Sequence, residues 1–126
     1  MAESKLPKEL ISDPDGLLTY EYLANNIEDL GDRLSEVTEN MIKVDTTGQF
    51  TVSAARYLHA INPALYSTEI DRLIAAAIDK DRERCYISSL LADIWGSDYS
   101  ERIDALKASD NNFRRIYKRL YPESII

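Results

Sequence analysis

Few residues in this 126-residue sequence have side chains suited to acid–base chemistry near neutral pH. His59 is the only histidine, the residue type whose charge ordinarily changes in that range. One helical turn before and after His59, no carboxylate stands where it could orient the imidazole. We therefore expect His59 to be a surface or partly buried residue without a catalytic role.

Cys85 is the only cysteine, which excludes an intrachain disulfide. It stands at the edge of an apolar segment, and we expect it to be a small buried hydrophobic residue. Arg82 and Arg84 are close enough in sequence to favour its thiolate form, which keeps a reactive thiol open as the alternative.

Sites for metals and phosphate-bearing cofactors have no sequence signature here. One histidine and one cysteine cannot form a closed zinc site within one chain. The stretch Asp13 to Gly16 reads as a turn before a helix, without the spaced oxygen ligands of a calcium loop. The four glycines are isolated from one another, so no phosphate-binding loop is present. We predict no catalytic residue, no metal site and no cofactor.

A cluster of basic residues near the C-terminus is the strongest candidate for a partner surface. The stretch from Phe113 to Tyr121 contains four bases and no acid, and the bases lie opposite an apolar stripe: Arg114, Arg115, Lys118 and Arg119. Three interpretations are open. The bases could solvate a packed helix, dock onto an acidic surface within the chain or between chains, or contact phosphates of nucleic acid or a membrane surface.

The acidic counterpart lies in the N-terminal third of the chain. Residues 1–45 contain eleven acidic and four basic residues and account for the whole net charge of −7. Five of these acids lie on the side of a predicted helix that faces away from its apolar residues. We call them the acidic ridge: Glu28, Asp29, Asp32, Glu36 and Glu39. A chain with this charge is not drawn as a whole to nucleic acid.

Both charged surfaces depend on helices that apolar spacing predicts. Between Tyr20 and Val44, apolar residues recur at alternating intervals of three and four, which indicates one long amphipathic helix of about 35 Å. This apolar seam comprises Tyr20, Leu23, Ile27, Leu30, Leu34, Val37, Met41 and Val44. Small flanking residues such as Gly31 favour several neighbouring helices over a two-stranded coiled coil. Either the later helices of the same chain cover this seam, or two chains pair along it. Because this helix outreaches the others and part of its seam could stay uncovered in a monomer, we favour the homodimer.

The rest of the chain reads as shorter amphipathic helices. We expect helix starts capped at Thr51, at Thr68 with Asp71, at Asp98 with Glu101, and at the Ser109–Asn112 stretch, and helix ends at Asn62, Gly96 and Pro122. No internal repeat at a fixed period is evident. We predict an all-α single domain over residues 1–126, a bundle of five or six helices built on one long N-terminal amphipathic helix, with residues 1–12 a frayed extension.

Composition limits the classes of function. The chain is 44% hydrophobic and 29% charged, as in soluble globular domains. No apolar run approaches the roughly 20 residues of a transmembrane helix, and the first sixteen residues lack the apolar core of a signal peptide. Together with the single cysteine, these features predict a cytoplasmic protein.

We therefore expect a non-enzymatic helical-bundle protein that acts in protein–protein interaction or assembly, with homodimerisation as one form of that assembly. The alternative is a nucleic-acid-associated regulatory protein that uses the basic face of the last helix. An enzyme would require distant carboxylates to gather around His59 or Cys85 in a cleft.

Overall fold

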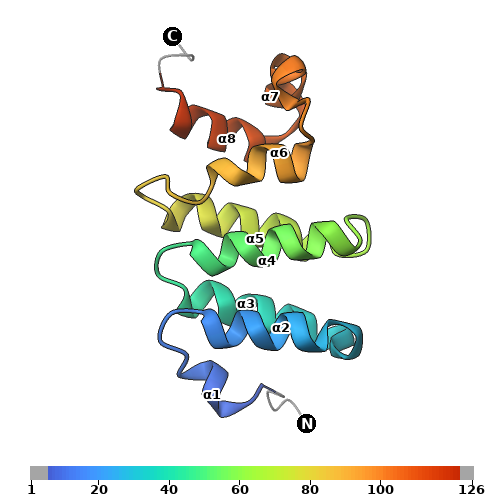
Figure 1. Ribbon diagram of the computed structural model, residues 1–126, viewed down its shortest axis with the longest axis vertical. Coiled ribbons are helices and arrows are strands. Elements are labelled where there is room, and N and C mark those ends of the chain that lie inside the picture. Colours follow the sequence, from blue (N-terminus) through green and yellow to red (C-terminus); the bar gives the residue numbers. More distant parts are fainter. Residues whose placement is uncertain (1–5, 123–126) are drawn as a thin grey trace.

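The computed structural model describes residues 6–122, and helices joined by short turns make up nearly all of this part of the chain (Figure 1). No strand occurs within these residues, which confirms the all-α prediction. The helices are α1 (Lys8–Ile11), α2 (Leu17–Leu30), the 3-10 helix η1 (Gly31–Arg33), α3 (Leu34–Val44), α4 (Gln49–Ile61), α5 (Ser67–Lys80), α6 (Ser88–Trp95), the 3-10 helix η2 (Tyr99–Glu101), α7 (Ile103–Ser109) and α8 (Asn111–Leu120).

The helices are stacked in pairs. Helices α2 and α3 form the first pair, α4 and α5 the second, and α6 and α8 the third, as Figure 1 shows from bottom to top. Each pair packs on the next, through α2 with α4, α3 with α5, α4 with α6, and α5 with α8. Helix α1 covers the first pair, and α7 packs on α8. Stacked helix pairs share one continuous apolar core, because each pair buries its inner faces against its neighbours.

The predicted long helix is two helices. Residues Leu17–Val44 are helical, but the chain reverses at Gly31, whose φ of 51° and ψ of −127° leave the helical region. Asn40 on α3 consequently donates a hydrogen bond to the hydroxyl of Thr19 on α2, at 3.0 Å. In a straight helix these two residues would be about 31 Å apart. The prediction of one long helix as the spine of the bundle is therefore wrong.

Most of the apolar seam is buried within one chain, and Tyr20, Ile27 and Val44 are partly buried. Leu23, Val37 and Met41 are fully buried, and Leu30 and Leu34 are 2% and 5% exposed. The reversal at Gly31 lets the two halves of the seam cover each other, and the second helix pair covers both. Our argument that an uncovered seam would need a second chain is therefore wrong.

A buried aspartate follows α1, α3 and α5 at the same edge of the stack. One carboxylate oxygen of Asp13 accepts hydrogen bonds from the backbone N–H groups two and three residues later in the chain, the latter being that of Gly16. The other oxygen accepts from the backbone N–H and the hydroxyl of Thr19, six residues later. Asp45 accepts four bonds at the same offsets. Asp81, 2% exposed, begins the third such loop. We call these segments the aspartate loops.

The hydrogen bonds in the first aspartate loop determine the charge state of its carboxyl. Burial by itself raises the pKa of Asp13, but the hydrogen bonds from Thr19, Gly16 and Asp15 outweigh burial, and the net pKa lies below the ordinary value. The carboxylate is thus the form that the folded loop stabilises.

Our search for a fixed period missed these loops. Their aspartates are 32 and 36 residues apart, and the third loop has neither the glycine nor the threonine of the first two.

The aspartate loops also explain why Thr51 is not an N-cap. It lies inside α4 and donates to Asp45, while Gly48 precedes the helix.

The other predicted helix boundaries have mixed outcomes. No side chain caps α5 or η2, so the caps expected at Thr68 and at Asp98 are wrong. Asp110 does cap α8, by accepting from the backbone of Phe113 at 3.1 Å. Gly96 ends α6, as expected.

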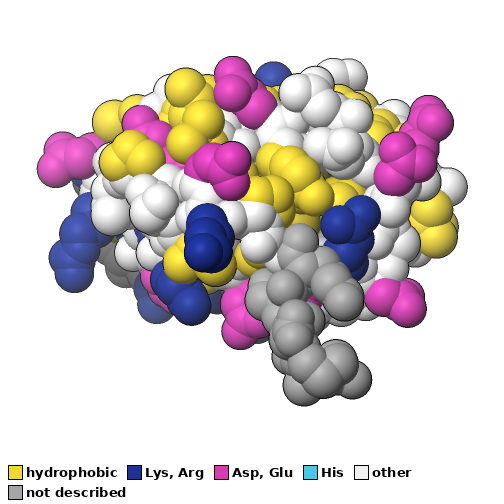
Figure 2. All heavy atoms as spheres, turned by 90° about the horizontal axis from the view of Figure 1, so that it is seen from below, with side chains coloured by type: hydrophobic (Ala, Val, Ile, Leu, Met, Phe, Trp, Pro, Cys, Tyr) yellow, Lys and Arg dark blue, Asp and Glu magenta, His cyan; other side chains and the backbone are white. Residues whose placement is uncertain are grey.

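The N-terminal end of the stack includes part of the segment that we expected to be frayed. Lys8–Ile11 form α1, and Asn40 donates to the main-chain oxygen of Leu10 at 2.8 Å. Residues 1–5 lie outside the described part. Ile11, Leu17 and Leu18 are 54%, 41% and 42% exposed on α1 and α2, and Figure 2, which views this end, shows hydrophobic side chains among scattered acidic ones.

Candidate functional site

A basic groove lies where the end of α5, the third aspartate loop and the C-terminal half of α8 meet. These elements come together at one edge of the stack (Figure 1). The groove has a volume of about 580 Å³. Among the described residues, five basic residues and one acidic residue line it, together with Ile78 and Pro122: Asp79, Arg82, Arg84, Arg115, Lys118 and Arg119.

Asp81 holds the loop side of this groove. Its carboxylate accepts hydrogen bonds from the backbone N–H groups of Cys85, Tyr86 and Ile87 at 2.7 to 2.9 Å. Three charge-assisted bonds to one buried carboxylate fix the course of the loop backbone. The basic residues of the loop therefore project from a defined support.

Arg84 occupies a backbone position that favours glycine. Its φ is +57°, and it is the one non-glycine residue with a positive φ within the described range 6–122. It stands three residues after Asp81, the position that Gly16 and Gly48 take in the two earlier loops, with φ of +105° and +91°. A side chain in this conformation costs about 1–2 kcal/mol. Such strain is concentrated at functional sites.

The stacking of the aspartate loops explains why only the third accepts a side chain here. A Cβ on Gly16 would lie 3.2 Å from the Cβ of Asp45, and one on Gly48 would lie 3.3 Å from the Cβ of Asp81. Each glycine thus packs against the next aspartate in the stack. Within the described range 6–122 no further aspartate loop packs on Arg84, and its guanidinium donates instead to the main-chain oxygen of Arg119 at 3.2 Å.

Two of the four predicted basic residues are held in place at the groove. Arg115 forms an ion pair with Asp79 at 2.8 Å. Arg119 donates to the main-chain oxygens of Ile78, Asp81 and Arg82, and so satisfies carbonyls at the C-terminal end of α5. These contacts join α8 to α5 and fix one wall of the groove.

The other two basic residues differ. Lys118 lines the groove and is exposed, and its ammonium group has no hydrogen-bond or ion-pair partner among residues 6–122. Arg114 does not line it. Its guanidinium donates to the main-chain oxygen of Lys107 and to the side chain of Asn111, both at 2.7 Å. The structure therefore brings together three of the four predicted bases.

Sequence reasoning did not place Arg82 and Arg84 in the basic surface. They precede Ser88, where α6 begins, and only the packing of their loop against α8 adds them to it. Aligning the three loops on their aspartates would have shown an arginine in the glycine position. That mismatch is the signal that a reader of the sequence could have used.

The acidic ridge is divided by the reversal at Gly31. Glu28 and Asp29 belong to α2, Asp32 to η1, and Glu36 and Glu39 to α3. Two of the five, Glu28 and Asp32, join Glu69 in a second groove of about 540 Å³, which we call the acidic groove. The remaining lining is mostly apolar: Ile27, Leu34, Leu65 and Tyr66, with Gly31 and Ser35.

Docking of the basic helix onto the acidic ridge within one chain does not occur. Helix α8 contacts α5, α6 and α7, and neither α2 nor α3. The basic and acidic grooves lie at opposite edges of the stack, because the aspartate loops connect the pairs on one edge and the α2–α3 and α4–α5 turns lie on the other (Figure 1). Electrostatic docking is thereby left to contacts between molecules.

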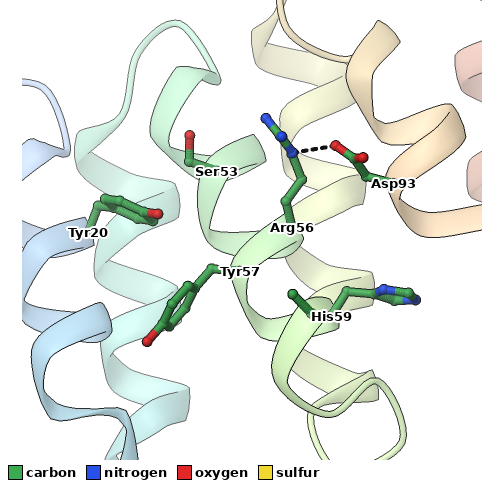
Figure 3. Close-up of a pocket in the computed structure, with 7 residues that line it drawn as sticks. Tyr20, Ser53, Arg56, Tyr57, His59 and Asp93 are labelled. Atoms are coloured by element: carbon green, nitrogen blue, oxygen red, sulfur yellow. Dashed lines mark ion pairs between the residues drawn. The ribbon is translucent and has the colours of Figure 1, made fainter.

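His59 lines a third cavity, of about 390 Å³, between α2, α4 and α6. Figure 3 shows its imidazole turned away from Tyr20 and Tyr57, with the Arg56–Asp93 ion pair, 2.5 Å long, higher on α4. The Ser53 hydroxyl donates to the main-chain oxygen of Gln49, one turn earlier on α4. The described residues therefore show no hydrogen-bonded pair of nucleophile and base in this cavity.

The prediction that Cys85 is buried is wrong. It is exposed in the third aspartate loop, beside Arg84. The reason is that the carboxylate of Asp81 draws in the backbone of Cys85, by a bond of 2.9 Å, and leaves the side chain outside.

No family model matches the chain, and neither a curated protein nor a solved structure matches it. Over the described residues, no helix is long and apolar enough to cross a membrane. The same residues contain no group of three or more His, Cys, Asp or Glu that could hold a metal ion.

Proposed function

We propose that this chain is a non-enzymatic protein-interaction module whose basic groove binds an acidic segment of a partner protein. The observation that carries the proposal is the charge of the groove, which holds five bases and one acid on a chain of net charge −7. Local excess charge opposite to that of the whole chain orients and accelerates association with a complementary partner. A cytoplasmic location, with a reduced Cys85, belongs to this proposal.

The pairing of charges supports a binding role. The ion pair between Asp79 and Arg115 uses the only acid that lines the groove among residues 6–122. Arg82, Arg84 and Lys118 are exposed and have no carboxylate partner in the described range. Burying an acidic side chain against these three groups would form charge-assisted hydrogen bonds, which are stronger than neutral ones.

Charge reversal tests the proposal. A fluorescein-labelled peptide containing a run of glutamates should bind the wild-type chain with an affinity that falls as salt rises. We expect the double variant Arg84→Glu, Lys118→Glu to lose this binding. Arg114→Glu is the matched control, because it reverses a charge on the same helix outside the groove. Equal binding by the double variant and the wild type would rule out the groove.

A second copy of the chain is one possible source of the acidic segment. Self-association is favoured because the acidic groove lies at the opposite edge of the stack from the basic groove. Its carboxylates, Glu28, Asp32 and Glu69, have no ion-pair partner within residues 6–122. A contact between two different surfaces repeats head to tail and forms a ring or an open filament. Light scattering at low salt should then give masses above 14.4 kDa that fall as salt rises.

Mixed variants separate self-association from binding to another protein. One variant neutralises the basic groove (Arg84→Ala, Lys118→Ala) and the other neutralises the acidic groove (Glu28→Gln, Asp32→Asn). Each alone should be monomeric, whereas their mixture should form a one-to-one dimer through the two intact grooves. If the mixture stays monomeric while the glutamate peptide binds the wild type, the partner is a different protein.

A nucleic-acid role is the alternative. It predicts that a single-stranded oligonucleotide binds more tightly than the acidic peptide and loses affinity steeply with salt. Absence of binding at low salt would remove this alternative.

A further inference from the structure

The basic groove has more positive charge than carboxylates of its own can balance. Once Asp79 is paired with Arg115, four cations remain in the lining: Arg82, Arg84, Lys118 and Arg119. A single carboxylate would neutralise one of them. A phosphate monoester carries a charge of about −1.5 to −2 near neutral pH and three strong acceptor oxygens. The charge in the groove is therefore better matched by a phosphate group.

The donors available in the groove also suit a phosphate. A guanidinium has five N–H donors in a planar fork that binds phosphate oxygens in pairs. In Arg84 one of these donors contacts the main-chain oxygen of Arg119, which positions the guanidinium, and the others have no partner among residues 6–122. Lys118 contributes an unpaired ammonium group from the opposite wall, on α8.

The backbone at Arg84 indicates that the arginine serves the groove and not the fold. Glycine occupies the equivalent position in the two loops that only connect helices. Arginine is less favourable there because of its backbone conformation, and the one hydrogen bond that its guanidinium makes within residues 6–122, to the main-chain oxygen of Arg119, is exposed. A ligand that needs the guanidinium accounts for its presence at a position where glycine would fold better.

We infer that the basic groove recognises a phosphorylated side chain in the partner's acidic segment, held by Arg82, Arg84 and Lys118. This inference rests on the proposed function, because it specifies the ligand of the same groove. A phosphopeptide fits the observations better than a nucleic acid. The excess charge is confined to one groove, whereas a nucleic-acid surface needs a row of phosphate contacts along the molecule.

Three peptide pools test the inference by fluorescence anisotropy. Each is degenerate in its flanking residues, and the central residue is phosphoserine, serine or glutamate; a fourth probe is the glutamate-run peptide. The phosphoserine pool should bind at least tenfold more tightly than the serine and glutamate pools, since one charge-assisted contact corresponds to about that factor. Inorganic phosphate should compete at high concentration and shift the guanidinium NMR signals of Arg82 and Arg84.

Arg84→Gly is the decisive variant, because glycine already occupies this position in two loops of the same protein. It should keep the helical circular dichroism of the wild type and lose about tenfold or more in affinity for the phosphoserine pool. Arg114→Ala removes a charge outside the groove and should bind as the wild type does.

The possible failures point to different conclusions. If the glutamate-run peptide binds and the phosphoserine pool has no advantage over the glutamate pool, the inference is wrong and the proposed function stands. If no peptide binds, both are wrong. Tighter binding of a single-stranded oligonucleotide than of the phosphoserine pool also overturns the inference, as does a folded Arg84→Gly variant with unchanged affinity. If inorganic phosphate shifts the arginine signals while no phosphopeptide binds, the ligand is a free phosphate compound and the inference is again wrong.

Discussion

Substitution of Gly31 by alanine tests whether the chain reverses between α2 and α3. In a continuous helix over Tyr20–Val44, the change would stabilise the protein by up to about 1 kcal/mol, because alanine favours helices more than glycine does. At the reversal, Gly31 has a φ of 51° and a ψ of −127°, which residues with a side chain rarely adopt. The two architectures therefore predict opposite signs for one substitution.

The structure separates backbone strain from steric contact at this position. A Cβ built on Gly31 meets no heavy atom within 4 Å, so the cost of alanine is conformational. We expect Gly31→Ala to lower the free energy of unfolding by about 1–3 kcal/mol, the usual cost of a residue held in such a conformation. For a chain of this length, the melting temperature should fall by roughly 4 °C for each kcal/mol.

Urea unfolding followed by circular dichroism would measure this change. Asn25→Ala is a suitable control, since Asn25 is exposed in the middle of α2 and should gain a few tenths of a kcal/mol, roughly, from helix propensity. If Gly31→Ala were as stable as the wild type or more so, the reversal at Gly31 and the helix pairing derived from it would be refuted.

The remaining predictions concern the aspartate loops and the contact between the first two helix pairs. Asp45→Ala should cost about 3–5 kcal/mol in urea unfolding, because buried donors, including both groups of Thr51, lose their acceptor; a loss below about 1 kcal/mol would contradict this. The depressed pKa of Asp13 means that its stabilisation is present above the ordinary carboxyl value of 3.8 and is lost as the pH falls through the lower native value. Thermal unfolding from pH 6 to pH 2 should therefore bring wild type and Asp13→Asn closer in stability, and a constant gap would contradict it. Tyr57→Phe removes a hydrogen bond to the main-chain oxygen of Ala24 and should cost about 1 kcal/mol in the same urea assay; an unchanged midpoint would show that the bond contributes nothing.

The fold was partly predictable because helix periodicity is a local property. The apolar positions of the seam were correct, and Leu23, Val37 and Met41 are fully buried. Their partners were not predictable from spacing, because a seam interrupted by a tight reversal keeps the same intervals as a straight one. Gly31 is compatible with both, and only the packing of α3 against α2 decides between them.

The candidate site was predictable to a similar extent. Arg115, Lys118 and Arg119 were recognised from four bases on one helix, and all three line the groove. Arg114 lies on the same helix but turns toward Lys107, a choice that depends on where α7 packs. Whether any of these residues binds a partner stays a prediction.

By itself, the sequence determined that the chain is helical and that its C-terminal helix is basic on one side, since both follow from residue types at helical intervals. The tertiary structure decided where the chain reverses and which charges meet. Arg84 is the clearest case. Arg84 is 31 to 35 residues from the three bases of α8 that line the groove. Its conformation results from three bonds to Asp81 and from the absence, within residues 6–122, of a further aspartate loop packed on it. Convergence of this kind is a property of packing between distant segments, which no local pattern of residues encodes.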